Sequence, residues 1–209
     1  MTRRGRTWAV GIMALSMVTL LLVAGPARAN ERSARFTNPS GGIDIVLSPS
    51  YVQQMFKAGV FIYGSSDVEI GLGDSLSMRV HFPLNGTSKS TPTRLIQVDG
   101  ETGGMDFYNG PKGTTASLNA PVVRRTGSTG FITGTLIGPF STESGQFEKT
   151  MPVFAMSSAR AKTSGTGWTM TAALTLTEQG AETLNTLLET SFFQAGAPIG
   201  SLSADVRSR

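Results

Sequence analysis

The sequence predicts an all-β domain, an antiparallel β-sandwich of two sheets closed by one or two short helices. Short runs of alternating apolar and polar residues recur along the chain, and turns rich in the chain's 25 Gly and 10 Pro separate them. Hydrophobic residues make up 39% of the 209 residues against 15% charged, a balance that excludes wholesale disorder. Cysteine is absent, which excludes disulfides, a Cys zinc site and a thiol nucleophile.

Residues 1–29 have the features of a secretory signal peptide. Arginines lie within residues 3–6, an apolar stretch covers residues 8–24, and an Ala-X-Ala site leads us to expect cleavage between Ala29 and Asn30. The alternative is an uncleaved membrane anchor, but the stretch is shorter than the roughly 20 apolar residues that span a bilayer. The sequence thus predicts a mature form that is secreted or held in the cell envelope and does not span the membrane.

The predicted signal peptide carries the chain's excess positive charge. Arg3, Arg4, Arg6 and Arg28 lie within it, and they account for the whole formal net charge of +4. The remaining chain is formally neutral, and it has no basic cluster interleaved with aromatic residues. Nucleic acid is therefore not an expected partner.

Residues 30–42 are polar, and we expect them to form a flexible lead-in to a single domain over residues 43–206. Residues 43–47 alternate as a strand does. A helix is expected next, because Ser48 is a good N-cap and a proline occupies the first helical position. Apolar residues at helical spacing follow, and Gly59 marks the end of this helix.

The middle of the chain reads as a series of short strands. The clearest covers residues 76–84, where every second residue is apolar and Pro83 indicates an edge or a bulge. Asn85 follows within an Asn-Gly-Thr sequon for N-glycosylation. The other expected strands cover residues 60–63, 68–70, 94–98, 105–108, 116–125, 131–137, 151–156 and 168–176.

A second helix and a last strand are expected near the C-terminus. Thr177 is a suitable N-cap for apolar residues at helical spacing, and residues 202–206 alternate as a final strand. The order of strand, capped helix and strand in residues 43–70 recurs in residues 171–206. This recurrence is either a weak internal repeat or chance. In the repeat interpretation, each helix closes one end of the sandwich.

Side chains suited to chemistry are few and scattered. His81 is the only histidine, and it is either a general base, a metal or haem ligand, or an ordinary residue on the polar face of its strand. No serine-nucleophile or phosphate-binding motif is present, so we assign no catalytic residue and no metal ligand. The carboxylates available for a hydrolytic pair are Asp67, Glu69, Asp74, Asp99, Glu101 and Asp106. The first three of these could also supply oxygen ligands to calcium, and the alternative for all six is an ordinary solvated place in a turn or at a strand edge.

Tyr63 and Tyr108 are the aromatic residues that best indicate a binding surface, because each lies beside a glycine-rich turn. Most other aromatic residues, Tyr51 among them, follow the periodicity of a strand or helix and are expected in the core. Tyr63 and Tyr108 are therefore the aromatic residues for which we look first for surface exposure, with a place in the core as the alternative.

Three segments resemble the haem-transport-associated (HtaA-type) domains of exported actinobacterial proteins. The segments are MRVHFPLNG (78–86), DGETGGMDFYNG (99–110) and the ending of the chain over residues 174–206. The resemblance implies a shared β-rich fold and haem as a ligand, since in those domains a Tyr ligates iron and a His supports it. It implies here that His81 pairs with Tyr63 or Tyr108. The family's opening Trp and closing Tyr-Gly are absent.

Three functions stay open at this point. The sequence favours a non-enzymatic binding or structural protein of the cell envelope, with an exposed apolar patch or strand edge for an envelope or extracellular protein. The second function is an extracellular carrier of a small ligand, haem included, with a pocket between the sheets near His81 or the tyrosines. The third is a hydrolase of an envelope polymer, with two carboxylates facing each other across a cleft.

Overall fold

The computed structural model describes residues 40–73, 76–84, 103–141, 145–164 and 167–207. They belong to one compact unit, Ser33–Arg209, whereas the unit Met1–Arg32 falls outside the described residues. The predicted signal peptide, residues 30–39 of the lead-in, the strand predicted at 94–98 and the Asn85 sequon fall outside them as well. No helix in the described part is long and apolar enough to cross a membrane.

Ten strands and two helices make up the described residues. The strands are β1 (Ser40–Leu47), β2 (Val60–Ser65), β3 (Glu69–Leu72), β4 (Met78–Pro83), β5 (Gly104–Asn109), β6 (Thr114–Thr126), β7 (Thr129–Ser141), β8 (Gly145–Ser164), β9 (Gly167–Leu176) and β10 (Pro198–Arg207). The helices are α1 (Pro49–Lys57) and α2 (Glu178–Leu188). β1 begins at Ser40, earlier than the sequence predicts, and β8 is a strand of 20 residues of which only the middle was predicted.

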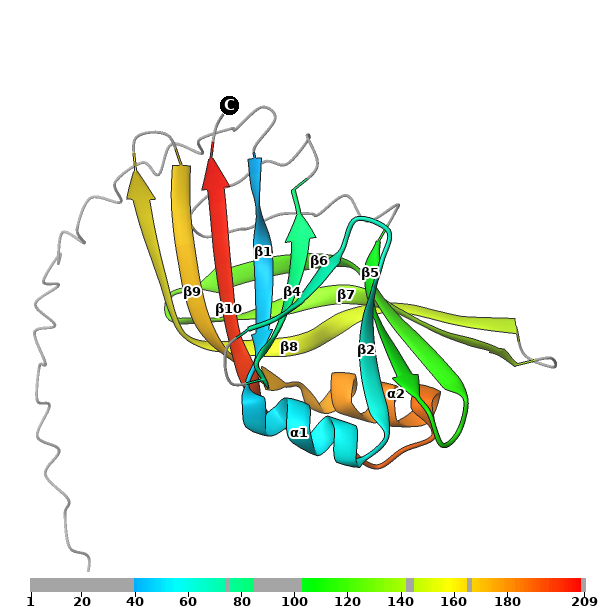
Figure 1. Cartoon of the computed structure of the whole chain (residues 1–209). Coiled ribbons are helices and arrows are strands. Elements are labelled where there is room, and N and C mark those ends of the chain that lie inside the picture. The colour runs from blue at the N-terminus through cyan, green and yellow to red at the C-terminus, as the bar shows by residue number, and fades with distance from the viewer. Residues whose placement is uncertain (1–39, 74–75, 85–102, 142–144, 165–166, 208–209) are drawn as a thin grey trace, which may run out of the picture. The chain divides into compact units, whose positions relative to one another are not determined.

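All ten strands form one antiparallel sheet in the order β2-β5-β6-β7-β8-β9-β10-β1-β4-β3. The all-β class is confirmed, but the prediction of two separate sheets is wrong. Figure 1 shows β9, β10, β1 and β4 passing in front of β6, β7 and β8, so a single sheet folds over itself. β2 and β3 stand at opposite ends of the strand order, yet they contact each other, which makes the sheet nearly closed and barrel-like.

Bulges in the long middle strands allow the sheet to curve. The pairing of β6 shifts register beside Ala120, whose φ is 47°, and the pairing of β8 shifts beside Ser158, whose φ is 52°. A bulge bends its strand and increases the local twist, so one long strand can serve both faces of the fold. Neither position is a glycine, so the sequence carries no mark of the bend.

Both helices begin where the sequence predicts. The Ser48 hydroxyl accepts a hydrogen bond from the backbone N–H of Tyr51 at 3.3 Å, and the Thr177 hydroxyl accepts one from Gly180 at 2.9 Å. The helices lie at the same end of the sheet, however, and not one at each end (Figure 1). The reason is that β1 and β9, which lead into the helices, are both antiparallel to β10 and so end at the same edge.

The two strand–helix–strand units share an order of elements but not a connection. α2 returns the chain from β9 to its neighbour β10. α1 instead carries the chain from β1 to β2, which pairs with β5 at the far end of the strand order. The similarity between the two units therefore extends no further than the order of their elements.

Apolar side chains from the sheet and both helices fill the interior as one cluster. Every methionine of residues 30–209 is buried in it, namely Met55, Met78, Met105, Met151, Met156 and Met170. Methionine is flexible and fills irregular gaps, which suits a core enclosed by a strongly curved sheet. Two cavities lie at the end of the sheet where both helices are found, and a third lies on the outer face of the sheet. None of these three lies between two sheets, where the carrier hypothesis predicts a pocket.

Candidate functional site

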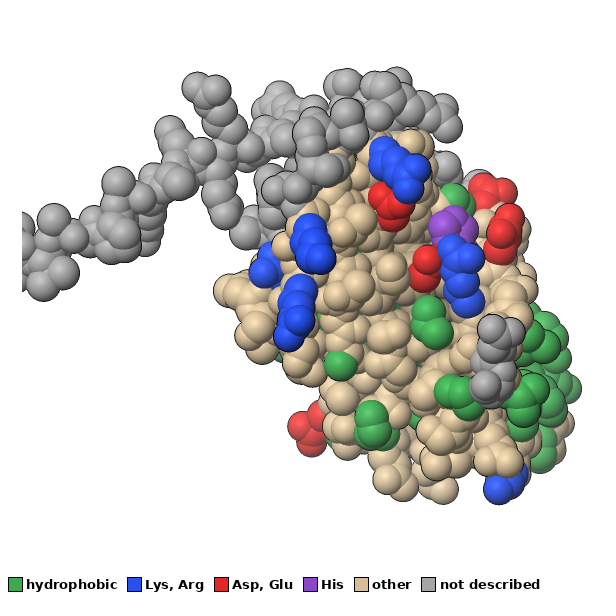
Figure 2. Space-filling view, turned by 60° about the vertical axis from the view of Figure 1, so that its left-hand side comes forward, with side chains coloured by type: hydrophobic (Ala, Val, Ile, Leu, Met, Phe, Trp, Pro, Cys, Tyr) green, Lys and Arg blue, Asp and Glu red, His purple; other side chains and the backbone are tan. Residues whose placement is uncertain are grey.

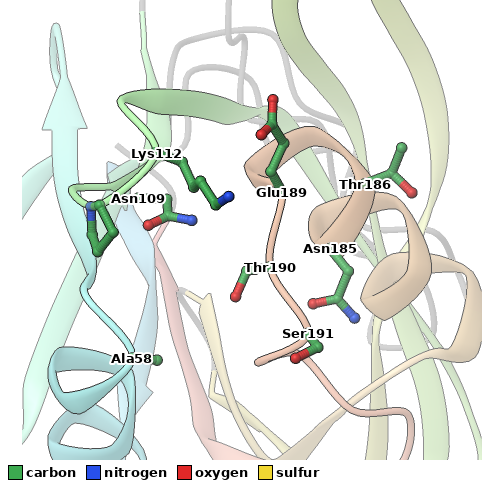
Figure 3. A pocket seen from close by; sticks show the side chains of 9 residues that line it. Ala58, Asn109, Lys112, Asn185, Thr186, Glu189, Thr190 and Ser191 are labelled. Atoms are coloured by element: carbon green, nitrogen blue, oxygen red, sulfur yellow. The ribbon is translucent and has the colours of Figure 1, made fainter.

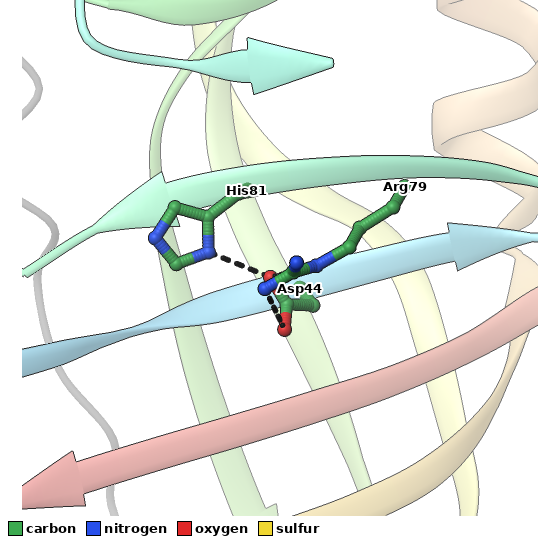
Figure 4. Close-up of polar contacts among 3 residues, drawn as sticks. All are labelled: Asp44, Arg79 and His81. Atoms are coloured by element: carbon green, nitrogen blue, oxygen red, sulfur yellow. Dashed lines mark hydrogen bonds and ion pairs between the residues drawn. The ribbon is translucent and has the colours of Figure 1, made fainter. Parts of the chain in front are cut away.

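His81 is held by a carboxylate from the neighbouring strand. It lies on β4, and its Nδ1 is 2.6 Å from Oδ1 of Asp44, its cross-strand neighbour on β1. Arg79, also on β4, donates from Nη2 to Oδ2 of the same carboxylate at 2.9 Å (Figure 4). This hydrogen bond and the charge of Asp44 raise the pKa of Arg79. Both oxygens of Asp44 are therefore engaged within this cluster on the outer face of the sheet.

The imidazole ring of His81 lies over Gly42 on β1. A Cβ atom at Gly42 would overlap ring atom Cε1, so the glycine leaves the space that the ring occupies. Among the described residues, His81 makes its hydrogen bond to Asp44 and none to Tyr63 or Tyr108, and no three His, Asp or Glu side chains are grouped to hold a metal ion. These contacts favour a structural role for the imidazole.

Tyr63 and Tyr108, in contrast, border a common hollow on the outer face of the sheet. Tyr63 on β2 pairs with Asp106 on β5, and Tyr108 lies two residues further along β5, so both tyrosines lie on the outer face. Tyr63 is exposed there, whereas Tyr108 is only partly exposed. The hollow has a volume of about 390 Å³, and Thr115 and Ser117 of β6 also line it. We call it the outer hollow. It brings together Tyr63 and Tyr108, whereas His81, the third residue that the sequence singled out, does not line it.

Tyr51 lines a second cavity, which we call the α1 cavity, of about 430 Å³ at the helix end. Residues of α1 form one side of it and the segment that follows α2 forms the other. Tyr51 is 8% exposed, and burial raises the pKa of its hydroxyl. Its ring lies 5.4 Å from the ring of Phe192. Among the described residues the hydroxyl has no hydrogen-bond partner. The α1 cavity thus contains a buried phenol whose polar atom is unengaged.

The sequence did not single out Tyr51 as a site residue. Helical periodicity correctly predicted that it is buried, and burial by itself indicates a core residue. The cavity beside it is completed by residues 191–198, which are distant in the chain. No local pattern connects α1 with that segment, so only the tertiary structure distinguishes Tyr51 from an ordinary core aromatic.

A third cavity, of about 550 Å³, adjoins the α1 cavity, and Ser191 lines both. Figure 3 shows it between the ends of the two helices, bordered by Lys112 from the turn between β5 and β6 and by Glu189 at the end of α2. Asn109, which is 3% exposed, donates from Nδ2 to the carbonyl of Leu188 at 2.7 Å. Its Oδ1 has no partner within the described part of the chain. Asn109 therefore ties the end of β5 to the end of α2 and fixes one wall of this cavity.

The carboxylates considered for hydrolysis are dispersed over the fold. Asp67 lies in the turn before β3, Glu69 lies on β3 opposite His81, and Asp106 lies on β5 opposite Tyr63. Those outside the described residues are Asp74, Asp99 and Glu101. Of the described candidates, only Asp106 lines one of the three cavities. The described candidates therefore do not place two carboxylates opposite each other in any of these three cavities.

Comparison with known proteins identifies structural neighbours only. No family model matches this chain, and no curated protein matches its sequence. Among solved structures, the haem-binding protein HtaB of Corynebacterium glutamicum superposes with a TM-score of 0.55 and 14% identity, over 83% of this chain and 95% of HtaB. The N-terminal domain of HtaA from the same organism gives a TM-score of 0.55 and 12% identity, over 83% of this chain and 99% of that domain.

The C-terminal domain of HtaA gives a TM-score of 0.51 and 13% identity, over 82% of this chain and 98% of that domain. At these identities the likeness shows a shared fold and nothing of the residues that act. The resemblance seen in the sequence to HtaA-type domains is therefore confirmed at the level of the fold.

Proposed function

We propose that this chain is an exported, non-enzymatic protein that binds a ligand of the haem class in the α1 cavity, with the Tyr51 hydroxyl as the iron ligand. The shared fold supports this proposal, because HtaB is a haem-binding protein. A fold alone does not determine function. The observation that carries the proposal is therefore the buried, unengaged phenol of Tyr51 beside an open cavity. Export rests on the features of residues 1–29.

The residues around Tyr51 suit an iron porphyrin. A tyrosine oxygen is a known axial ligand of haem iron in proteins. Phe192 lies beside Tyr51 and offers an apolar ring against which a porphyrin can pack. Lys57 lines the same cavity and can pair with a carboxylate of the ligand. The cavity therefore combines an oxygen ligand, an apolar wall and a cation.

Ligation of iron by Tyr51 requires the loss of the phenolic proton. Burial raises the pKa of this hydroxyl above its ordinary value, so the free protein keeps the proton at neutral pH. Because binding releases one proton, the affinity for haemin should rise about tenfold for each pH unit in the neutral range. Dissociation constants measured at two values one pH unit apart test this expectation.

A haemin titration followed by absorbance tests the proposal directly. The wild-type chain should give a saturable change in the Soret band, and Tyr51→Phe should lose it or bind at least about tenfold more weakly. Tyr63→Phe, Tyr108→Phe and His81→Ala serve as controls and should bind as the wild type does. Unchanged binding by Tyr51→Phe would overturn the proposal. Loss of binding in Tyr63→Phe or Tyr108→Phe would move the ligand to the outer hollow.

A second candidate function is attachment to another component of the cell envelope, and an exposed surface favours it. Phe56 of α1 and Phe61 of β2 are both exposed, and their rings stack with centroids 5.6 Å apart. Figure 2 shows hydrophobic side chains gathered toward one side of the molecule. Exposed apolar groups that gather in this way are typical of contact sites.

Retention of the chain on isolated cell envelopes tests this second function. Phe61→Ser should reduce retention several-fold. Phe131→Ser is the matched control, because Phe131 is 49% exposed on β7, and it should be retained as the wild type is. Equal retention of both variants and the wild type would contradict an attachment role for the Phe56–Phe61 surface.

A further inference from the structure

The outer hollow is a site distinct from the α1 cavity, since the two share no lining residue. It is built from two rows of cross-strand neighbours. In one row Tyr63 faces Asp106, which faces Ser117, and in the other Tyr108 faces Thr115. Side chains directly opposed in antiparallel strands have Cβ atoms about 4.5–5.5 Å apart. The Asp106 carboxylate is therefore surrounded by two aromatic rings and by hydroxyl groups, all carried on a paired sheet.

Asp106 gives the outer hollow a negative charge. Of the described residues it is the only charged one that lines the hollow, and it is partly buried. Within the described part of the chain, its carboxylate makes no ion pair and no hydrogen bond. The faces of the tyrosine rings add negative potential of their own. A ligand that complements this hollow must carry a positive charge.

The surroundings of Asp106 favour an organic cation over a metal ion. Calcium takes about six to eight oxygen ligands, and the described residues contain no group of three carboxylate or imidazole side chains that could hold a metal. A substituted ammonium group instead gains from contact with aromatic faces within about 6 Å of the ring centre. The volume of about 390 Å³ accommodates such a group.

We propose that the outer hollow binds a quaternary or substituted ammonium group, held by the Asp106 carboxylate and the rings of Tyr63 and Tyr108. The hydroxyls of Thr115 and Ser117 can bond an oxygen attached to the cation. A free choline-like molecule and a methylated lysine of another protein offer the same chemistry. This inference goes beyond the proposed haem function and does not depend on it.

Choline chloride is the first probe, titrated into the purified chain and followed by amide shifts in two-dimensional NMR spectra. Saturable shifts should appear in β2, β5 and β6. The neutral isostere 3,3-dimethylbutan-1-ol has the same shape without the charge, and it should bind at least about fivefold more weakly. Equal affinity for choline and the isostere, or an absence of saturable shifts with choline, would overturn the proposal.

Asp106→Asn is the decisive variant, because it keeps the shape of the side chain and breaks no bond among the described residues. It should weaken choline binding about tenfold, and Tyr108→Leu should weaken it several-fold. Glu148→Gln is the matched control, an exposed carboxylate on β8, and should bind choline as the wild type does. Unchanged choline binding by Asp106→Asn would contradict the assignment.

Further arms separate the source of the cation and the two proposed sites. A peptide with trimethyllysine that binds more tightly than choline would indicate a protein partner, and the reverse order would indicate a free small molecule. Tyr51→Phe should bind choline as the wild type does, and Asp106→Asn should bind haemin as the wild type does. Failure of either site is therefore visible independently of the other.

Discussion

Replacing Tyr51 with Phe removes a single oxygen atom from a buried ring and should change how stability depends on alkaline pH. Burial raises the pKa of the hydroxyl in the folded chain, whereas in the unfolded chain it ionises near its ordinary value of about 10. Tyr51 therefore leaves the free energy of unfolding independent of pH below about pH 10. Above that value the free energy of unfolding falls as the pH rises, because only the unfolded chain then releases the proton.

The size of this loss follows from the linkage relation. With one group of pKa about 10 in the unfolded state and no ionisation in the folded state, the free energy of unfolding at pH 11 falls by about 1.4 kcal/mol relative to pH 8. Tyr51→Phe should lack this alkaline fall in the free energy of unfolding. At neutral pH the variant should be about as stable as the wild type, because the substitution breaks no hydrogen bond to a described residue.

Urea denaturation of the wild type and Tyr51→Phe at about pH 8 and about pH 11 measures this difference. Other groups titrate equally in both proteins, so subtracting the two pH dependences isolates Tyr51. Tyr63→Phe is the control and should keep the alkaline loss, since Tyr51 is still present. If Tyr51→Phe loses as much stability as the wild type between the two pH values, the hydroxyl is not held in a buried, protonated state and the argument fails.

Three further changes should alter stability, each measured as the shift in a urea denaturation curve. Asn109→Ala removes the hydrogen bond to the Leu188 carbonyl and should cost about 1–2 kcal/mol; an unchanged midpoint would mean that this bond does not hold β5 to α2. Gly42→Ala places a methyl group where the His81 ring lies and should cost about 1–3 kcal/mol, and less when combined with His81→Ala. Ala120→Gly relieves a left-handed backbone at the bulge in β6 and should stabilise by up to about 1 kcal/mol, so a loss of stability would show that this conformation carries no strain.

Local chemistry determined the elements of this fold. Ser48 and Thr177 begin the two helices because a hydroxyl at the N-cap satisfies a backbone N–H that the helix leaves free. Period-2 alternation located most of the described strands because a strand presents successive side chains to opposite faces. Helical spacing predicted in the same way that Tyr51 is buried, and the glycine-rich turn beside Tyr63 led us to expect its exposure. These outcomes depend on neighbours within a few residues, which is what a sequence pattern records.

The tertiary structure alone decided which strands pair and therefore which side chains meet. Alternation shows that a strand has an inner face, but it does not say whether one curved sheet or two flat ones supply the other side. The contact of His81 with Asp44 depends on the pairing of β4 with β1, and the hollow shared by Tyr63 and Tyr108 depends on the pairing of β2 with β5. The cavity beside Tyr51 depends on both helices reaching the same end of the sheet. Pairings between distant segments are selected by the packing of the whole core, and no local run of residues carries that information.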